Sequence, residues 1–160
     1  MATNIFLKIG AIKGESTEDR HQDEIEVLSW SWGMSQDSST GVGAGGGAGR
    51  VNFHDLSFSH RLDKASPSLM RACATGERQK EATLTQRKAG SGLPEFLILR
   101  MADVTVTGVL PSASGADDGL IELVSLQCAN VDLEYKPQKA DGSFDQSVHF
   151  KFDIRANRPA

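Results

Sequence analysis

Apolar and polar residues alternate with a period of two along most of the chain, a pattern that is typical of β-strands with one buried face. In the first such segment Ile5, Leu7 and Ile9 share one face and Lys8 lies on the other. The same alternation marks six further segments, which are residues 24–34, 51–59, 82–88, 96–106, 120–135 and 148–154. The pattern therefore predicts a mainly β protein of about seven strands.

The second of these segments contains a change of phase. Ile25 and Val27 share one parity, whereas Leu28, Trp30 and Trp32 take the other. One extra residue in a strand moves every later side chain to the opposite face of the sheet. The sequence therefore predicts a β-bulge where Val27 meets Leu28.

A single helix interrupts the series of strands. Ser66 offers a capping hydroxyl, Pro67 suits the first helical position, and Gly76 suits the C-terminal end. A helix of about ten residues is marginal in isolation. We therefore expect it to dock on the strands through apolar residues such as Leu69.

Two segments are rich in loop-forming residues. Residues 35–50 are polar and then almost pure glycine and alanine, and residues 111–119 are rich in Pro, Ser, Gly and Asp. Strands joined by short turns, with one helix, are typical of a small β-barrel or of two packed sheets. A chain of 160 residues has the size of one domain, so we expect a single domain over 1–160 with a long loop at 35–50.

Two of the predicted strands are apolar on both faces. Both the segment 96–106 and the segment 120–135 show this pattern. An apolar outer face has to be covered, either by the helix or by another copy of the same protein. We expect some of each, and five residues of these strands are assigned to a contact between subunits: Leu97, Leu99, Met101, Ile121 and Leu123.

The charge balance and the length of the apolar runs argue against two classes of partner. The chain has 17 basic and 21 acidic residues, a net charge of −4, and no run of basic residues, so we expect no binding to nucleic acid. The longest apolar run, Phe96–Leu99, is far shorter than the roughly 20 residues of a membrane-spanning helix. Lys8 breaks the apolar stretch at the start, so we expect no signal peptide and no membrane insertion.

Patterns that could carry chemistry are weak in this sequence. Along a strand His54 and His60 would stand roughly 20 Å apart, with Asp55 pointing the other way, so we interpret all three as exposed or partly satisfied polar residues. The glycines of Gly41-x-Gly43-x-x-Gly46 match a dinucleotide fingerprint, but a strand and not a helix is predicted after them. We therefore expect no catalytic residue, no metal and no cofactor.

Ser29 and Ser31 alternate with Trp30 and Trp32. Tryptophan is highly buried on average, so the two serines are expected on the opposite face of the sheet. A face of small polar residues suits solvent, and it also suits the wall of a wide, wet cavity that contacts cargo. The residue pattern leaves both interpretations open.

Six ordered motifs resemble one protein family. They are IKGES at 12–16, WSWGMSQ at 30–36, GGGAGRV at 45–51, DLSFSHRLDKASPSLMRAC at 55–73, LTQRKAG at 84–90 and EYKPQKADG at 134–142. In this order they resemble the Hcp (haemolysin-coregulated protein) family of bacterial type VI secretion systems. The resemblance runs from the first residue nearly to the last and is weakest over 111–119.

The resemblance implies a small β-barrel of two antiparallel sheets with one flanking α-helix. It also implies a structural protein, not an enzyme, whose homohexameric rings stack into a hollow tube. The implied partners are other copies of the chain, a VgrG spike, a contractile sheath and small effector proteins in the lumen. A cytoplasmic pool would be secreted to the extracellular space or a target cell without a cleaved signal peptide, and no toxin domain is expected after the last strand.

This scheme gives roles to the unusual segments of the sequence. Ser29 and Ser31 are expected to line the lumen and contact effectors. The glycine-rich part of the long loop is expected to reach the next ring of the stack, and it consists of Gly41, Val42, Gly43, Ala44, Gly45, Gly46 and Gly47. The alternative function is a free-standing β-barrel module that binds carbohydrate or a protein partner, and the presence or absence of rings separates the two.

Overall fold

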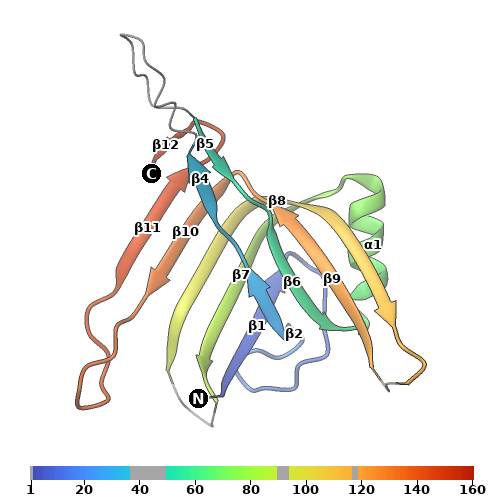
Figure 1. Cartoon of the computed structure of the whole chain (residues 1–160), viewed down its shortest axis with the longest axis horizontal. Coiled ribbons are helices and arrows are strands. Elements are labelled where there is room, and N and C mark those ends of the chain that lie inside the picture. The colour runs from blue at the N-terminus through green and yellow to red at the C-terminus, as the bar shows by residue number, and fades with distance from the viewer. Residues whose placement is uncertain (1, 37–49, 90–93, 117–118) are drawn as a thin grey trace.

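The computed structural model describes residues 2–36, 50–89, 94–116 and 119–160. Within these ranges it contains twelve strands and one helix, and its strand pairs are antiparallel (Figure 1). The elements are β1 (Thr3–Ile9), β2 (Ile25–Val27), β3 (Ser29–Ser31), β4 (Met34–Gln36), β5 (Val51–Phe53), β6 (Leu56–Arg61), α1 (Ser66–Thr75), β7 (Arg78–Lys88), β8 (Glu95–Ala113), β9 (Leu120–Gln127), β10 (Asn130–Tyr135), β11 (Val148–Asp153) and β12 (Arg158–Pro159).

The large sheet returns on itself to form a barrel. β7 pairs with β1 and β8, β8 pairs with β9, β9 pairs with β6, and β6 pairs with β3. β1 pairs on its other side with β2, and only Leu28 separates β2 from β3, so the barrel closes through this segment. β10, β11 and β12 extend the sheet from β8, and β4 and β5 form a second, two-stranded sheet. The expected mainly β architecture of two antiparallel sheets and one helix is confirmed.

The change of phase in the second predicted strand marks the point where the barrel closes. Val27 pairs with Ile5 of β1, whereas Ser29 pairs with Ser59 of β6. Leu28 lies between them with 49% of its surface exposed, and its backbone N–H donates to the carbonyl oxygen of Ser59. The irregularity falls where it was predicted, but it is a break at which the strand changes partner and not the predicted β-bulge.

Other predicted strands are also divided, because an apolar pattern can continue through a corner of the sheet. Residues 51–59 form β5 and β6, and residues 120–135 form β9 and β10. The prediction of a loop over 111–119 is wrong for its first three residues, which belong to β8. Pro111 pairs with Glu122 of β9 at a point where β8 has no second neighbour, and such edge positions are where strands tolerate proline.

β8 is a strand of 19 residues that serves two parts of the sheet. Its first half pairs with β7 and β10, and its second half pairs with β9. Asp103, between the two halves, has a φ of 53°, in the left-handed region that non-glycine residues seldom adopt. The alternation of buried and exposed side chains shifts by one residue at Asp103. Two odd-numbered residues before it and two even-numbered residues after it all lie in the core: Leu99, Met101, Val104 and Val106.

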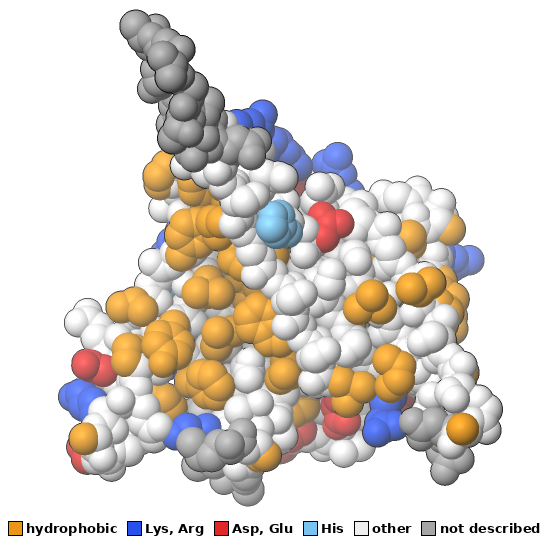
Figure 2. All heavy atoms as spheres, viewed as in Figure 1, with side chains coloured by type: hydrophobic (Ala, Val, Ile, Leu, Met, Phe, Trp, Pro, Cys, Tyr) orange, Lys and Arg blue, Asp and Glu red, His pale blue; other side chains and the backbone are white. Residues whose placement is uncertain are grey.

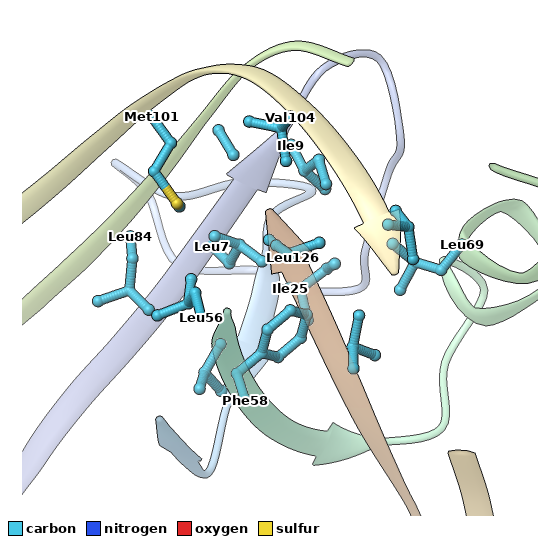
Figure 3. Packing of buried hydrophobic residues seen from close by; sticks show 14 of the residues in the cluster. Leu7, Ile9, Ile25, Leu56, Phe58, Leu69, Leu84, Met101, Val104 and Leu126 are labelled. Atoms are coloured by element: carbon cyan, nitrogen blue, oxygen red, sulfur yellow. The ribbon is translucent and has the colours of Figure 1, made fainter. Parts of the chain in front are cut away.

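The core fills the interior of the barrel and extends beneath α1 (Figure 3). Its largest fully buried apolar side chains are Phe58, Leu7, Ile9, Ile25, Leu56, Leu69, Leu84, Leu99, Leu126 and Val104. Truncating a leucine at such a position to alanine typically costs about 2–5 kcal/mol. The alternating residues of the sequence therefore supply the main stabilisation of the fold.

α1 docks on the barrel through Leu69, which is fully buried, as expected. The predicted end is confirmed, since Gly76 adopts a left-handed φ of 69° at the C-cap. The predicted start is one residue late, because the N-cap is Ala65 and not Ser66. The Ser66 hydroxyl instead accepts from the Asp63 N–H at 3.2 Å, and Asp63 Oδ1 accepts from the Ala65 N–H at 2.9 Å.

Candidate assembly and cargo surfaces

Ser29 and Ser31 of β3 lie beside serines of two neighbouring strands. Ser29 pairs with Ser59 of β6, and the two hydroxyl oxygens are 2.6 Å apart. Ser31 pairs with Ser57, which pairs in turn with Ser125 of β9. Both β3 serines are exposed. We call these five residues the serine face, a polar strip across three strands on the outside of the barrel.

The tryptophans of the same segment point the other way. Trp30 pairs with Phe58, which is buried in the core. The indole N–H of Trp30 donates to Gln86 Oε1 at 3.0 Å. Trp32 stacks on Phe53 with ring centroids 6.0 Å apart. The predicted separation of serines and tryptophans onto opposite faces is confirmed.

Two of the five residues assigned to a contact between subunits belong to the interior. Leu99 is fully buried and Met101 is 3% exposed within a single chain, which corrects the expectation that they lie on an outer apolar face. The cause is the change of phase at Asp103. Uniform alternation would place Leu99 and Met101 opposite the core residue Val104, but all three point inward.

The remaining assigned residues lie in two separate apolar patches. Leu123 is 44% exposed and pairs with Leu110 of β8, which is 64% exposed, and Ile121 is half-buried on the same face of β9. We call Leu110, Ile121 and Leu123 the leucine patch. The patch lies next to the serine face, because Ser125 and Leu123 follow one another on that side of β9.

The second patch continues the inner face of the sheet beyond the barrel. Leu97 pairs with Tyr135 of β10, and Tyr135 pairs with Val148 of β11. Tyr135 is 42% exposed and Val148 is 57% exposed, and Leu133 and Phe150 beside them are partly buried. We call these five residues the tyrosine patch. Figure 2 shows hydrophobic side chains gathered on the left, over β10 and β11, and a smaller group on the right, over β8 and β9.

A loop of the same chain covers another apolar part of the sheet. Phe6 on β1 is 3% exposed and stacks on His21 of the β1–β2 connection, with ring centroids 4.4 Å apart. His21 Nε2 lies 2.8 Å from Glu95 Oε1 of β8, and its Nδ1 lies 2.7 Å from Glu24 Oε2. The buried Arg87 of β7 donates to Glu18 Oε1 of the same connection at 2.9 Å. The sequence analysis expected a cover only over the strands at 96–106 and 120–135, from the helix or another copy, and it did not anticipate this loop.

Comparison with known proteins decides the family. The family model described as "Type VI secretion system effector, Hcp" matches residues 6–139, which is most of the chain. The chain belongs to the Hcp family. It is therefore a type VI secretion protein of the tube-forming Hcp class, and the free-standing binding module is not favoured.

Relatives of the Hcp family resemble this chain over nearly its whole length. Protein hcp1 of Pseudomonas aeruginosa is 51% identical over 159 residues, covering 98% of each chain. The crystal structure of Hcp1 from Salmonella typhimurium has 37% identity, covers 100% of both chains and superposes with a TM-score of 0.82. Hcp2 from the same organism has 33% identity, covers 97% of this chain and 98% of its own, and gives a TM-score of 0.74.

The three polar residues considered for a metal site are dispersed in this Hcp chain. His54 is exposed, with Nε2 3.3 Å from Ser35 Oγ, and Asp55 Oδ2 accepts from the Thr107 hydroxyl at 2.7 Å. His60 is fully buried and not exposed, but it is partly satisfied as the alternative expectation had it, because Nε2 lies 2.9 Å from Glu122 Oε1 and Nδ1 has no hydrogen-bond partner among the described residues. Within the described residues no group of three or more His, Cys, Asp or Glu side chains could hold a metal ion.

Burial raises the pKa of the Cys128 thiol to about 11, and both Cys128 and Cys73 are free. In the part of the chain that the structure describes, no helix has the length and apolar character to cross a bilayer. The predicted stacking residues, Gly41–Gly47, lie outside the described residues, and β4 and β5 bring Gln36 and Val51 opposite each other on either side of that segment.

Proposed function

We propose that this Hcp chain forms homohexameric rings that stack into a hollow tube, and that the tube carries small effector proteins in its lumen. The observation that carries the proposal is the presence of two different apolar patches on one chain. In Figure 1 the β10–β11 side and the β8–β9 side lie on opposite sides of the molecule. A contact in which one patch meets the other patch of the next copy is heterologous, and such contacts generate rings when the rotation closes.

The side chains of the two patches support this arrangement. Leu110 and Leu123 on one side, and Tyr135 and Val148 on the other, leave large apolar surfaces in water. Fully burying a leucine or valine side chain is worth about 1.5–3 kcal/mol, so mutual burial of the patches favours association. The number of six copies is taken from the Hcp family.

The serine face supports a role in contacting cargo. Hydroxyl groups both donate and accept hydrogen bonds, so Ser29 and Ser31 can satisfy varied polar groups on an effector. A ring repeats the same weak contact in every subunit, and multivalency raises the combined affinity without any new contact. We therefore propose that the serine face lines the lumen.

The glycine-rich segment and the external partners complete the proposal. Gly41–Gly47 is proposed to reach the next ring, because glycine tolerates the varied backbone conformations that a contact arm adopts. A VgrG spike at the tip and a contractile sheath around the tube are the further proposed partners. In this proposal the chain is a structural protein and not a catalyst. It is made in the cytoplasm and is secreted, without a cleaved signal peptide, to the extracellular space or into a target cell.

Light scattering of the purified chain at micromolar concentration tests the proposal. The proposal predicts a closed assembly whose mass is a fixed multiple of 17.2 kDa. A monomer at these concentrations contradicts it and returns the free-standing module to consideration.

A further inference from the structure

We propose that a basic groove between α1 and the segment that follows β1 binds an acidic segment of a partner protein. The groove has a volume of about 450 Å³. Six of its lining residues carry the argument: Lys13, Lys64, Ser68, Arg71, Glu77 and Gln79. None of them belongs to the serine face or to either apolar patch, so the proposal is independent of ring formation.

The charge of the groove is opposite to the charge of the whole chain. The lining residues include three cations, Lys13, Lys64 and Arg71, and one acid, Glu77, whereas the chain carries a net charge of −4. Among the described residues neither Lys13 nor Arg71 forms an ion pair. Lys64 Nζ lies 3.9 Å from Asp23 Oδ1 in an exposed pair, which is a weak interaction. The groove therefore presents cations that are free to meet carboxylates.

Gln79 gives the groove a second, independent feature. It is 8% exposed, and its side-chain amide has no hydrogen-bond partner in the described part of the chain. The amide atoms are not sealed inside the protein, so they are open to the groove and can meet a ligand there. The amide carries two N–H donors, which suit a carboxylate oxygen brought in by a ligand.

The backbone beside Gln79 is shaped to hold the amide at the groove. Gly10 has a φ of 49°, and a Cβ at this position would lie far inside contact distance of Gln79 Oε1. The Gly10 N–H is fixed by a 2.9 Å hydrogen bond to the carbonyl oxygen of Glu81. A larger residue at position 10 would displace the amide, so the glycine keeps Gln79 in its place beside the cations.

The distribution of the cations favours an acidic peptide over a small anion. Lys13 follows β1, Lys64 precedes α1, and Arg71 lies within α1, so the charges come from three segments. A groove of about 450 Å³ has the size of a pocket that takes a molecule of many atoms, and a single phosphate would fill only a small part of it. Several carboxylates along one peptide can meet several cations at once.

The test uses a fluorescent hexaglutamate peptide and measures its binding to the assembled protein by anisotropy. Changing Lys13→Glu together with Arg71→Glu is expected to weaken binding more than tenfold. Gln79→Met keeps the size of the side chain and removes its donors, and it is expected to weaken binding about tenfold, the loss for one hydrogen bond to a charged group. Glu77→Gln removes the only acid of the groove and is expected to strengthen binding.

Lys139→Glu is the matched control, because Lys139 is an exposed cation of the β10–β11 connection, outside the groove. Unchanged binding in the Lys13→Glu, Arg71→Glu variant overturns the proposal. Equal loss in the Lys139→Glu control overturns it as well, since binding would then follow net charge. Equal binding of hexaglutamine, or displacement of the peptide by equimolar inorganic phosphate, shows a site of different chemistry and also overturns it.

Discussion

The imidazole of His60 and the carboxylate of Glu122 lie 2.9 Å apart, from Nε2 to Oε1, and neither side chain is exposed at all. His60 is on β6 and Glu122 is the residue that pairs with it on β9. Asp63 approaches from the turn before α1, with Oδ2 3.8 Å from His60 Nδ1. Within the described residues His60 Nδ1 and Glu122 Oε2 have no hydrogen-bond partner. This buried pair therefore links two strands of the barrel to the start of the helix.

The first prediction concerns the worth of this pair. Glu122→Leu leaves His60 buried without its partner, and we expect it to lower the free energy of unfolding by about 3–5 kcal/mol. The double variant His60→Leu, Glu122→Leu removes both polar groups, so we expect it to recover much of that loss. Urea denaturation of both variants and of the parent measures the coupling. A double variant that is no more stable than Glu122→Leu would contradict this account.

The second prediction concerns pH. Burial raises the pKa of Asp63 above its ordinary value of 3.8, although the Ala65 N–H and the nearby His60 act in the opposite direction. Glu15 and Glu122, which face the same carboxyl, raise the pKa further. A carboxyl whose pKa is higher in the folded state loses stability as the pH rises from its unfolded pKa through its folded pKa. We therefore expect Asp63→Asn to gain stability relative to the parent as the pH rises above about 4.

Urea denaturation of Asp63→Asn and the parent at pH 3.5 and pH 7 checks the sign. Asparagine keeps the Oδ1 acceptor for the Ala65 N–H, so the variant removes the charge and preserves the turn. A difference in stability that stays the same at both pH values, or that moves in favour of the parent at pH 7, would show that folding does not raise the pKa of Asp63.

The third prediction concerns assembly. Leu123→Asp places a charge in the leucine patch, and we expect it to weaken association of the subunits by about tenfold or more, as at a residue central to an interface. Leu28→Asp is the matched control, because Leu28 is 49% exposed and lies outside both patches. Sedimentation velocity measures both variants. Equal loss of assembly in the two variants would show that any exposed charge is disruptive and would remove the support for the leucine patch.

The fourth prediction concerns cargo. Ser31→Gln replaces a small hydroxyl of the serine face with a longer side chain, and we expect the rings to form while the retained effector proteins fall about tenfold or more, since every subunit repeats the change. Ser143→Gln, on the exposed β10–β11 connection, is the control. Mass spectrometry of the proteins that co-purify with the rings provides the measurement. Unchanged cargo in the Ser31→Gln rings would exclude the serine face from the lumen.

Local patterns predicted much of the fold because strand alternation and helix signals act over short distances. The break at Leu28 was visible as a change of phase, and the end of α1 was visible as Gly76. The change of phase at Asp103 was missed, because no glycine or proline marks a left-handed residue inside a strand. That single omission put Leu99 and Met101 on the wrong face.

Contacts between distant segments could not be predicted from the sequence. His60 and Glu122 are 62 positions apart, and nothing near either residue signals the other. The same holds for His21, which meets Glu95 across 74 positions, and for Gly10 beside Gln79. Such pairs arise only when the strand order is known, so the buried histidines and the basic groove emerge from the structure.

In the proposed ring, the leucine patch of each copy meets the tyrosine patch of the next copy, and the repeated contact closes on itself. Electron microscopy of the purified protein, with class averages viewed down the symmetry axis, tests this claim most directly. The account predicts rings with sixfold rotational symmetry and an open centre. Particles without a central opening, or isolated monomers, would contradict it.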